Sequence, residues 1–140
     1  MNDHLMITAF GQLKLEDVIG RRDLGRLRLA TPAEVAGLSG ETASGSYRGM
    51  LENWRIVAID LLDGPPEFVF LGTRDNEYWG TSPIRAIDLE ACRARTQSGS
   101  IYSLSAAGQG APPFVHVLHM CFMLHTWGMG RALAVPEVSY

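Results

Sequence analysis

Four side chains that can bind metal or transfer protons lie close together near the end of the chain: His116, His119, Cys121 and His125. Imidazole and thiolate are good zinc ligands, and residues four apart share one face of a helix. Cys121 and His125 have this spacing, whereas the other two face roughly the opposite way, so a metal would need a ligand from elsewhere. The sequence contains no CxxC or HExxH motif. The pattern favours core or interface histidines over a metal site.

Cys121 is also a candidate nucleophile, with His125 as its base. A reactive cysteine needs an accessible cleft and a lowered thiol pKa, but the neighbours of Cys121 are apolar and would raise that pKa. We therefore expect Cys121 to be a buried packing residue. A small metal- or thiol-dependent enzyme is the alternative to this interpretation, and no cofactor is predicted.

A basic cluster of Arg21, Arg22 and Arg26 lies in the first quarter of the chain. Arginine suits recognition of carboxylates and phosphates because its guanidinium donates two parallel hydrogen bonds. Asp17 and Asp23 lie among these residues and partly neutralise them. The cluster is either a solvated hairpin or a contact surface for an acidic partner.

An acidic cluster with aromatic neighbours forms the counterpart: Asp75, Glu77, Tyr78 and Trp79. Such a patch would suit docking onto a basic protein surface, for example one built for nucleic acid. Ordinary solvated turns are the plainer interpretation of the same residues. Paired carboxylates could also serve a hydrolase, but the sequence gives no signature of a pocket for it.

Composition limits the classes of protein that these residues could belong to. The 140 residues are 46% hydrophobic and 19% charged, with a formal net charge of −3, which indicates one folded domain over residues 1–140. The mild negative charge argues against direct binding of nucleic acid. Low charge content favours a protein partner or self-association.

The expected location is cytoplasmic and away from membranes. The start of the chain has no positive charge before an apolar run, as a signal peptide would have. The most apolar segment, residues 114–129, carries three histidines and is too short for a typical membrane span.

Alternating apolar residues and frequent turn signals predict an α+β fold. We expect a twisted antiparallel sheet, or a small partly open barrel, of short strands with one long C-terminal helix packed on it. Thr31, Pro32 and Glu34 predict a short N-terminal helix near residues 32–37, because they match a capping box. The expected strands cover residues 54–59, 67–71, 84–89, 93–96 and 100–104.

The predicted long helix, residues 114–127, is apolar on nearly every face. A sheet of short strands covers one side of such a helix well and the other side poorly. The uncovered side is the main reason to expect a protein partner. It also supports a second alternative, a homodimeric structural or accessory protein that associates through this helix.

The second half of the chain resembles a loosely defined set of small proteins carried by bacterial phages and conjugative elements. The residues that carry the resemblance are Leu51-Glu52-x-Trp54, Thr81-Ser82-Pro83-Ile84 and Thr96-x-Ser98-Gly99-Ser100-x-Tyr102-x-Leu104. The resemblance implies a context rather than an activity, because small mobile-element proteins often bind and block a host complex, as anti-CRISPR and related anti-defence inhibitors do. We therefore predict a non-catalytic protein-binding module, with an inhibitor of a CRISPR-type host defence complex as its specific form.

Overall fold

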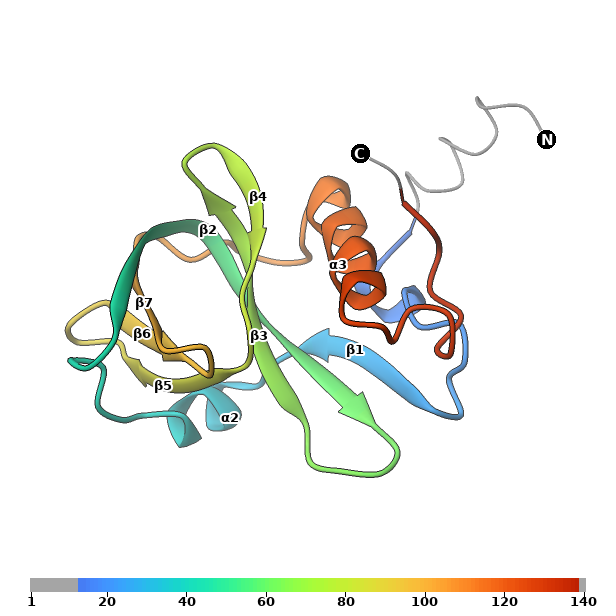
Figure 1. Cartoon of the computed structure of the whole chain (residues 1–140), viewed down its shortest axis with the longest axis horizontal. Coiled ribbons are helices and arrows are strands. Elements are labelled where there is room, and N and C mark those ends of the chain that lie inside the picture. Colours follow the sequence, from blue (N-terminus) through green and yellow to red (C-terminus); the bar gives the residue numbers. More distant parts are fainter. Residues whose placement is uncertain (1–12, 139–140) are drawn as a thin grey trace.

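The computed structural model describes residues 13–138 of the chain. These residues form seven strands, two α-helices and one 3-10 turn (Figure 1). In chain order the elements are η1 (Leu15–Asp17), β1 (Gly25–Leu29), α2 (Pro32–Gly37), β2 (Ser46–Leu61), β3 (Glu67–Arg74), β4 (Glu77–Gly80), β5 (Ile84–Asp88), β6 (Arg93–Thr96), β7 (Ser100–Leu104) and α3 (Phe114–Thr126). The α+β class is confirmed, and so are the short helix after Thr31 and the long helix near the C-terminus. No helix within residues 13–138 is long and apolar enough to cross a membrane.

The strands form one open sheet in the order β4-β3-β2-β7-β6-β5, with β1 paired to β2 as well. The sheet is mixed rather than wholly antiparallel, because β2 and β7 run in parallel. This corrects one detail of the expected sheet. The first half of β2 and the last strand are about 50 residues apart in sequence, and local periodicity gives no information on the direction in which such distant strands pair.

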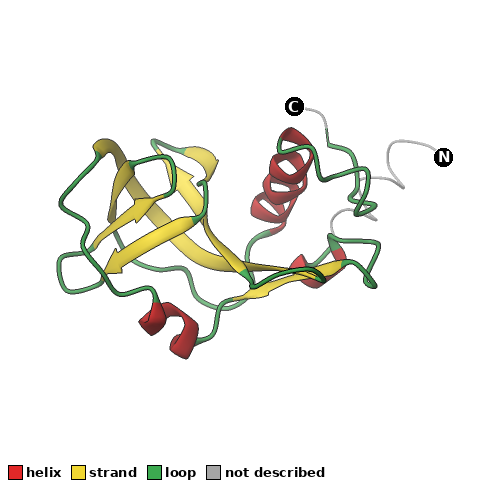
Figure 2. Ribbon diagram, turned by 60° about the horizontal axis from the view of Figure 1, so that its bottom comes forward, coloured by secondary structure: helices red, strands yellow, loops and turns green. Residues whose placement is uncertain are grey.

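The 16-residue strand β2 belongs to two parts of the sheet because it bends in its middle. The pairing with β3 shifts register between Glu52 and Arg55, where Asn53 adopts a φ of 47°. Asparagine tolerates this left-handed conformation better than most residues. Before the bend β2 pairs with β7, and after it β2 pairs with β1 and β3. Figures 1 and 2 show the resulting shape, with β5–β7 curled on one side and α3 on the other.

Two hydrophobic cores lie on opposite faces of the central strands. Val57 and Val69 belong to the core under α3, whereas Ile56 and Phe70 belong to the core enclosed by β5, β6 and β7. A strand with both faces buried needs apolar residues at consecutive positions rather than at alternate ones. This explains why residues 56–59 and 68–71 are continuous apolar runs.

The short helix α2 has the capping box that the sequence predicts. The Thr31 hydroxyl accepts a hydrogen bond from the Glu34 amide at 3.2 Å, and the Glu34 carboxylate accepts one from the Thr31 amide at 2.9 Å. Arg28 then binds Glu34 at 2.6 Å and Asp60 of β2 at 2.7 Å. The Arg28 guanidinium lowers the pKa of Glu34 to about 2. These ion pairs attach α2 to the sheet.

Arg55, which is buried in β2, fixes the loop that leads into α3. Its guanidinium donates to the carbonyl oxygens of Gly110 at 2.9 Å and Gln109 at 2.7 Å. Gly108 makes room for this arrangement, because a Cβ at that position would lie 2.3 Å from Arg55 Nη1. The position of α3 therefore depends on a buried arginine whose planar fork matches two carbonyl groups.

We predict that Arg55→Lys lowers the free energy of unfolding by about 2 kcal/mol, because an ammonium group cannot reach both carbonyls with the same geometry. Urea unfolding followed by tryptophan fluorescence measures the change. The matched control is Arg48→Lys at an exposed position of the same strand, which should leave the midpoint unchanged. Equal midpoints for the two variants would show that Arg55 does not hold the loop.

Candidate functional site

A groove lies between β4 and α3, and exposed aromatic side chains from both elements line it. Its volume is about 400 Å³. Tyr78 of β4 is 41% exposed, and Phe122 and Trp127 at the other side are each 39% exposed. We call this feature the β4–α3 groove; the residues that line it are Glu77, Tyr78, Trp79, Gly80, Thr81, Ser82, His119, Phe122, Met123, Thr126 and Trp127.

The groove exists because α3 approaches β4 very closely at Gly80. A Cβ at Gly80 would lie 1.8 Å from the Met123 sulfur, so any larger residue would push the helix away. Further along, the ring of the buried His116 packs edge-on against Tyr78, with ring centroids 5.7 Å apart. These contacts hold the two walls of the groove together.

Thr81 connects β4 to the rest of the sheet and lines the groove. Its amide donates to the Phe70 carbonyl at 3.1 Å, and its hydroxyl accepts from the Phe70 amide at 3.1 Å. Thr81 is itself buried. The strand is therefore anchored to β3 just where it turns away from the helix.

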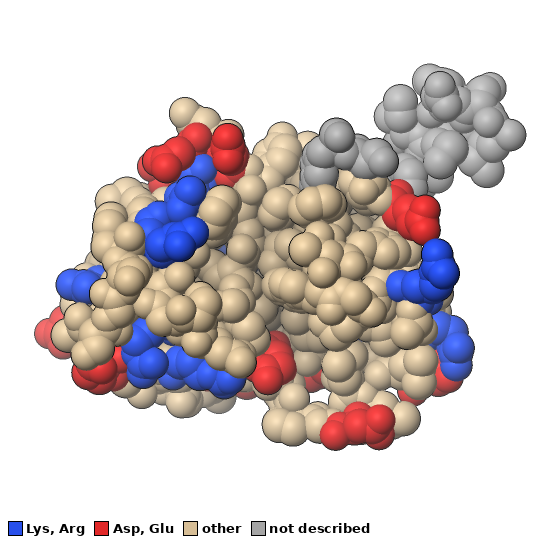
Figure 3. Space-filling model, viewed as in Figure 1, with Lys and Arg blue, Asp and Glu red and all other residues tan. Residues whose placement is uncertain are grey.

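A second cleft, of about 260 Å³, continues the groove past Trp127. The two hollows share Ser82 and Trp127. The second is lined by Ile59, Leu61, Glu67, Val69, Ser82, Pro83, Trp127 and Met129. We refer to both hollows together as the extended groove. Figure 3 shows the surface between the β3–β4 hairpin and α3 largely in tan.

The lining of the extended groove includes Glu67 and Glu77 but no lysine or arginine. The register of β4 places the Glu77 side chain with Trp79 and Arg74 on the face away from α3, so Glu67 is the carboxylate on the α3 side. His119 also lines it, and burial, together with the neighbouring His116, lowers the pKa of the His119 imidazole. At neutral pH this imidazole is therefore mainly uncharged.

The structure separates the four residues of the predicted acidic and aromatic patch. Both Glu77 and Tyr78 line the groove, but the Tyr78 side chain faces α3 whereas the Glu77 side chain lies on the opposite face, across from Arg74. Trp79 lines it too, but its indole N–H donates to the Tyr102 hydroxyl at 3.2 Å, and the Arg74 guanidinium lies 3.7 Å above its ring. Asp75 lies at the tip of the β3–β4 turn with its side chain in solvent.

The arginines of the predicted basic cluster are each bound to a carboxylate. Arg21 pairs with Asp23 at 2.8 Å, and Arg22 pairs with Asp17 at 2.9 Å. Arg26 lies 3.3 Å from Asp60, which also binds Arg28. These pairs leave little net charge at this surface, and none of the three arginines lines the extended groove.

The candidate metal ligands of α3 point to different surroundings. His116 faces Tyr78, and the His119 ring lies 5.9 Å from that of Phe122. His125 Nε2 lies 2.9 Å from the Val135 carbonyl oxygen. Within residues 13–138 no group of three or more potential ligands is placed to hold a metal ion.

Cys121 is a packing residue, as the sequence predicts. It is fully buried in the core under α3, and burial raises the pKa of its thiol to about 11. The thiol is therefore protonated at neutral pH and is a poor nucleophile. His125, its expected base, interacts with the C-terminal segment instead.

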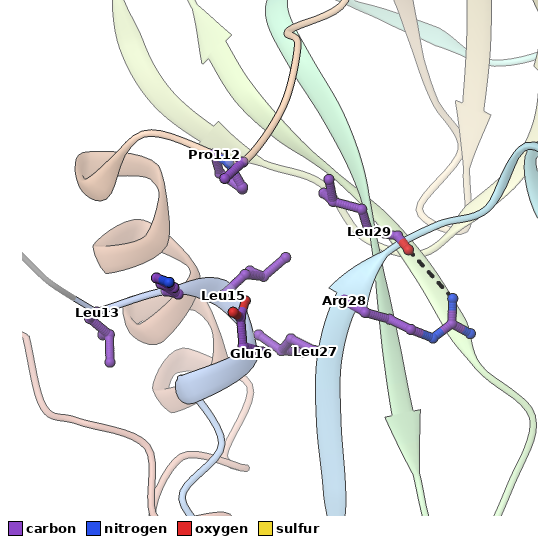
Figure 4. Close-up of a pocket in the computed structure, with 9 residues that line it drawn as sticks. Leu13, Leu15, Glu16, Leu27, Arg28, Leu29 and Pro112 are labelled. Carbon is purple, nitrogen blue, oxygen red and sulfur yellow. Dashed lines mark hydrogen bonds between the residues drawn. The ribbon is translucent and has the colours of Figure 1, made fainter.

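Two further clefts lie away from the groove, and both are lined mainly by apolar residues. Figure 4 shows a cleft of about 370 Å³ between residues 13–16 and β1, with leucines on both sides. Arg28 lines this cleft, but its guanidinium is bound to Glu34 and Asp60. It also donates a long hydrogen bond, 3.5 Å, to the Leu29 carbonyl. Another apolar cleft, of about 380 Å³, lies between α2 and Trp54.

No protein-family model, curated protein or solved structure matches this chain. The resemblance of its second half to mobile-element proteins therefore stays a prediction. Among the groove residues that the sequence did not assign to a site are Phe122, Trp127 and Glu67. For Phe122 and Trp127 the sequence indicates only that the long helix has more apolar side chains than one face of a sheet can cover.

We predict that the two cysteines differ sharply towards a thiol reagent. Cys92 is exposed, whereas Cys121 is buried with a raised pKa. Ellman's reagent at pH 7.5 should titrate one thiol per native chain and a second only in denaturant. Cys92→Ser should abolish the rapid reaction, and Cys121→Ser should preserve it. Rapid modification of Cys121 in the native Cys92→Ser variant would restore the case for a thiol enzyme.

We predict that His116 makes the protein less stable as the pH falls from 7.5 to 5.5. Burial, and then the positive charge of Arg55, lower the pKa of His116 in the folded state. As the pH falls below the ordinary histidine pKa near 6.5, His116 therefore binds a proton in the unfolded chain before it does so in the folded protein. The free energy of unfolding decreases as a result. The Nδ1 atom is buried without a hydrogen-bond partner in the described structure. His116→Leu should thus reduce this pH dependence in urea unfolding; identical pH profiles would contradict the assignment.

Proposed function

We propose that this protein is a non-catalytic protein-binding module and that the β4–α3 groove receives its partner. The observation that carries the proposal is the set of exposed rings on both sides of the groove, Tyr78, Phe122 and Trp127. Tyrosine and tryptophan side chains supply much of the binding energy at protein interfaces, because they bury a large area with few rotatable bonds. Here they stand around a hollow whose two walls are in close contact at Gly80 and Met123.

The rigidity of the groove supports binding of a segment from another protein. Gly80, Met123 and the buried ring of His116 fix the distance between the walls. A surface already held in its binding shape loses little conformational entropy when a partner binds. The groove also continues into the second hollow at Ser82 and Trp127, which suits an extended chain better than a compact small molecule.

The charges of the extended groove speak against its use as a homodimer interface. In a symmetric dimer the same surface faces itself, so the Glu67 carboxylates of both copies would share one interface. The lining of the extended groove holds no lysine or arginine that could compensate them. A partner with positive charges removes this repulsion. Such partners include basic protein surfaces built to hold nucleic acid, which the predicted host defence complex would have.

The test is a selection of random 12-residue peptides, displayed on phage, against the immobilised protein. Binding of the enriched peptides is then measured by fluorescence anisotropy. We expect Trp127→Ala and Phe122→Ala to weaken binding at least about tenfold. Tyr47→Ala is the matched control, because Tyr47 is 62% exposed and lies outside the groove. Circular dichroism confirms that each variant is folded, and unchanged affinity in Trp127→Ala would refute the proposed site.

A further inference from the structure

Strand β4 is the last strand at one end of the sheet, where it pairs with β3 alone (Figure 1). The backbone of such an edge strand offers N–H and C=O groups that no neighbouring strand uses. All of residues 77–82 line the β4–α3 groove, although the side chains of neighbouring residues in a strand lie on opposite faces of the sheet. The hollow therefore runs along the free backbone edge of β4 as well as beside its α3 face.

The register of β4 identifies the backbone groups at this edge. The Thr81 amide donates to the Phe70 carbonyl at 3.1 Å, so these two residues form a hydrogen-bonded pair. Such pairs alternate with non-hydrogen-bonded pairs along an antiparallel ladder. Gly80 and Tyr78, one and three positions before Thr81, therefore belong to non-hydrogen-bonded pairs with β3. Their N–H and C=O groups point away from β3, towards the free edge.

The edge groups of Tyr78 and Gly80 are open to another chain. Within residues 13–138 they form no hydrogen bond. Tyr78 is 41% exposed, and Gly80 is partly exposed. A donor and an acceptor at every second residue are what an extended segment needs in order to join a sheet. The edge of β4 is therefore a template for one more strand.

The two faces of an added strand would meet different surfaces. On the α3 side lie the ring of Tyr78 and the exposed rings of Phe122 and Trp127, which line the same hollow. Aromatic rings of this kind favour apolar or aromatic neighbours. On the opposite face the Arg74 guanidinium covers the Trp79 ring at 3.7 Å, so that face accepts polar side chains. The surroundings of β4 thus select apolar residues at every second position of the added strand.

We propose that the partner protein adds an extended segment to the edge of β4 as a further strand of the sheet. The segment hydrogen-bonds to the backbone groups of Tyr78 and Gly80 and places an apolar or aromatic side chain at every second position on the α3 side. This inference rests on the proposed function and adds the mode of binding. In such strand addition the backbone hydrogen bonds supply affinity, and the alternate side chains supply specificity.

The backbone of a peptide enriched on the wild-type protein tests this mode. Each amide of the peptide is replaced in turn by its N-methyl form, which removes the N–H and keeps the side chain. Fluorescence anisotropy should show binding at least about tenfold weaker at alternate positions of the paired stretch and little changed at the positions between them. The reason is that only every second N–H of a strand points to its neighbour. Losses without this alternation would overturn the inference.

Tyr78→Pro and Tyr78→Ala test the same contact from the side of the protein. Both variants lack the ring, but only Tyr78→Pro lacks the N–H, which the ladder with β3 does not use. Proline is accepted at such positions of edge strands. Tyr78→Pro should bind the peptide at least about fivefold more weakly than Tyr78→Ala. Equal affinities in the two variants, both folded by circular dichroism, would contradict the inference; if Tyr78→Pro does not fold, the N-methyl series decides.

Trp127→Ala separates this inference from the proposed function, because it removes a ring of the groove and leaves the edge of β4 intact. If Trp127→Ala weakens binding but the N-methyl series shows no alternation, the binding site stands and strand addition is wrong. If Trp127→Ala has no effect, both proposals fail. Weaker binding in Trp127→Ala together with the alternating pattern supports both.

Discussion

The close packing of Met123 against Gly80 is the contact on which the shape of this protein depends most. It brings α3 to within van der Waals distance of β4, as no residue with a Cβ would permit. Met120 and Leu124 are then fully buried on one side of the helix, while Phe122 and Trp127 remain exposed beside the strand. An apolar helix that a small sheet covers on one side only thereby becomes one wall of a groove, and the uncovered rings become its lining.

The sheet supports this arrangement through its second core. Phe70 packs on the face of β3 away from α3, among residues of β5, β6 and β7, and its backbone holds Thr81 at the end of β4. Trp79 fills part of the same core and donates to Tyr102. The strand that carries Tyr78 is thus fixed from both faces of the sheet. Such a wall can present an exposed tyrosine without losing its position when a partner binds.

Local signals predicted much of the fold, and long-range pairings account for what they missed. The capping box at Thr31 and Glu34 involves neighbours in sequence, and so do the glycine and proline signals that bound α3. The parallel pairing of β2 with β7 joins distant segments, so no local pattern encodes it. Glu77 and Tyr78 were predicted as a contact surface. Phe122 and Trp127 were not, because an apolar helix does not indicate which of its faces the sheet covers.

The central claim is that the groove between β4 and α3 is the surface that binds a partner. Amide chemical shifts of ¹⁵N-labelled protein, recorded while an enriched peptide from the displayed library is added, test it most directly. The account predicts progressive shifts at residues 77–83 and 119–129 and at Glu67, the segments that line the extended groove. Shifts confined to the apolar cleft beside α2 and Trp54, or to Arg21 and its neighbours, would contradict it.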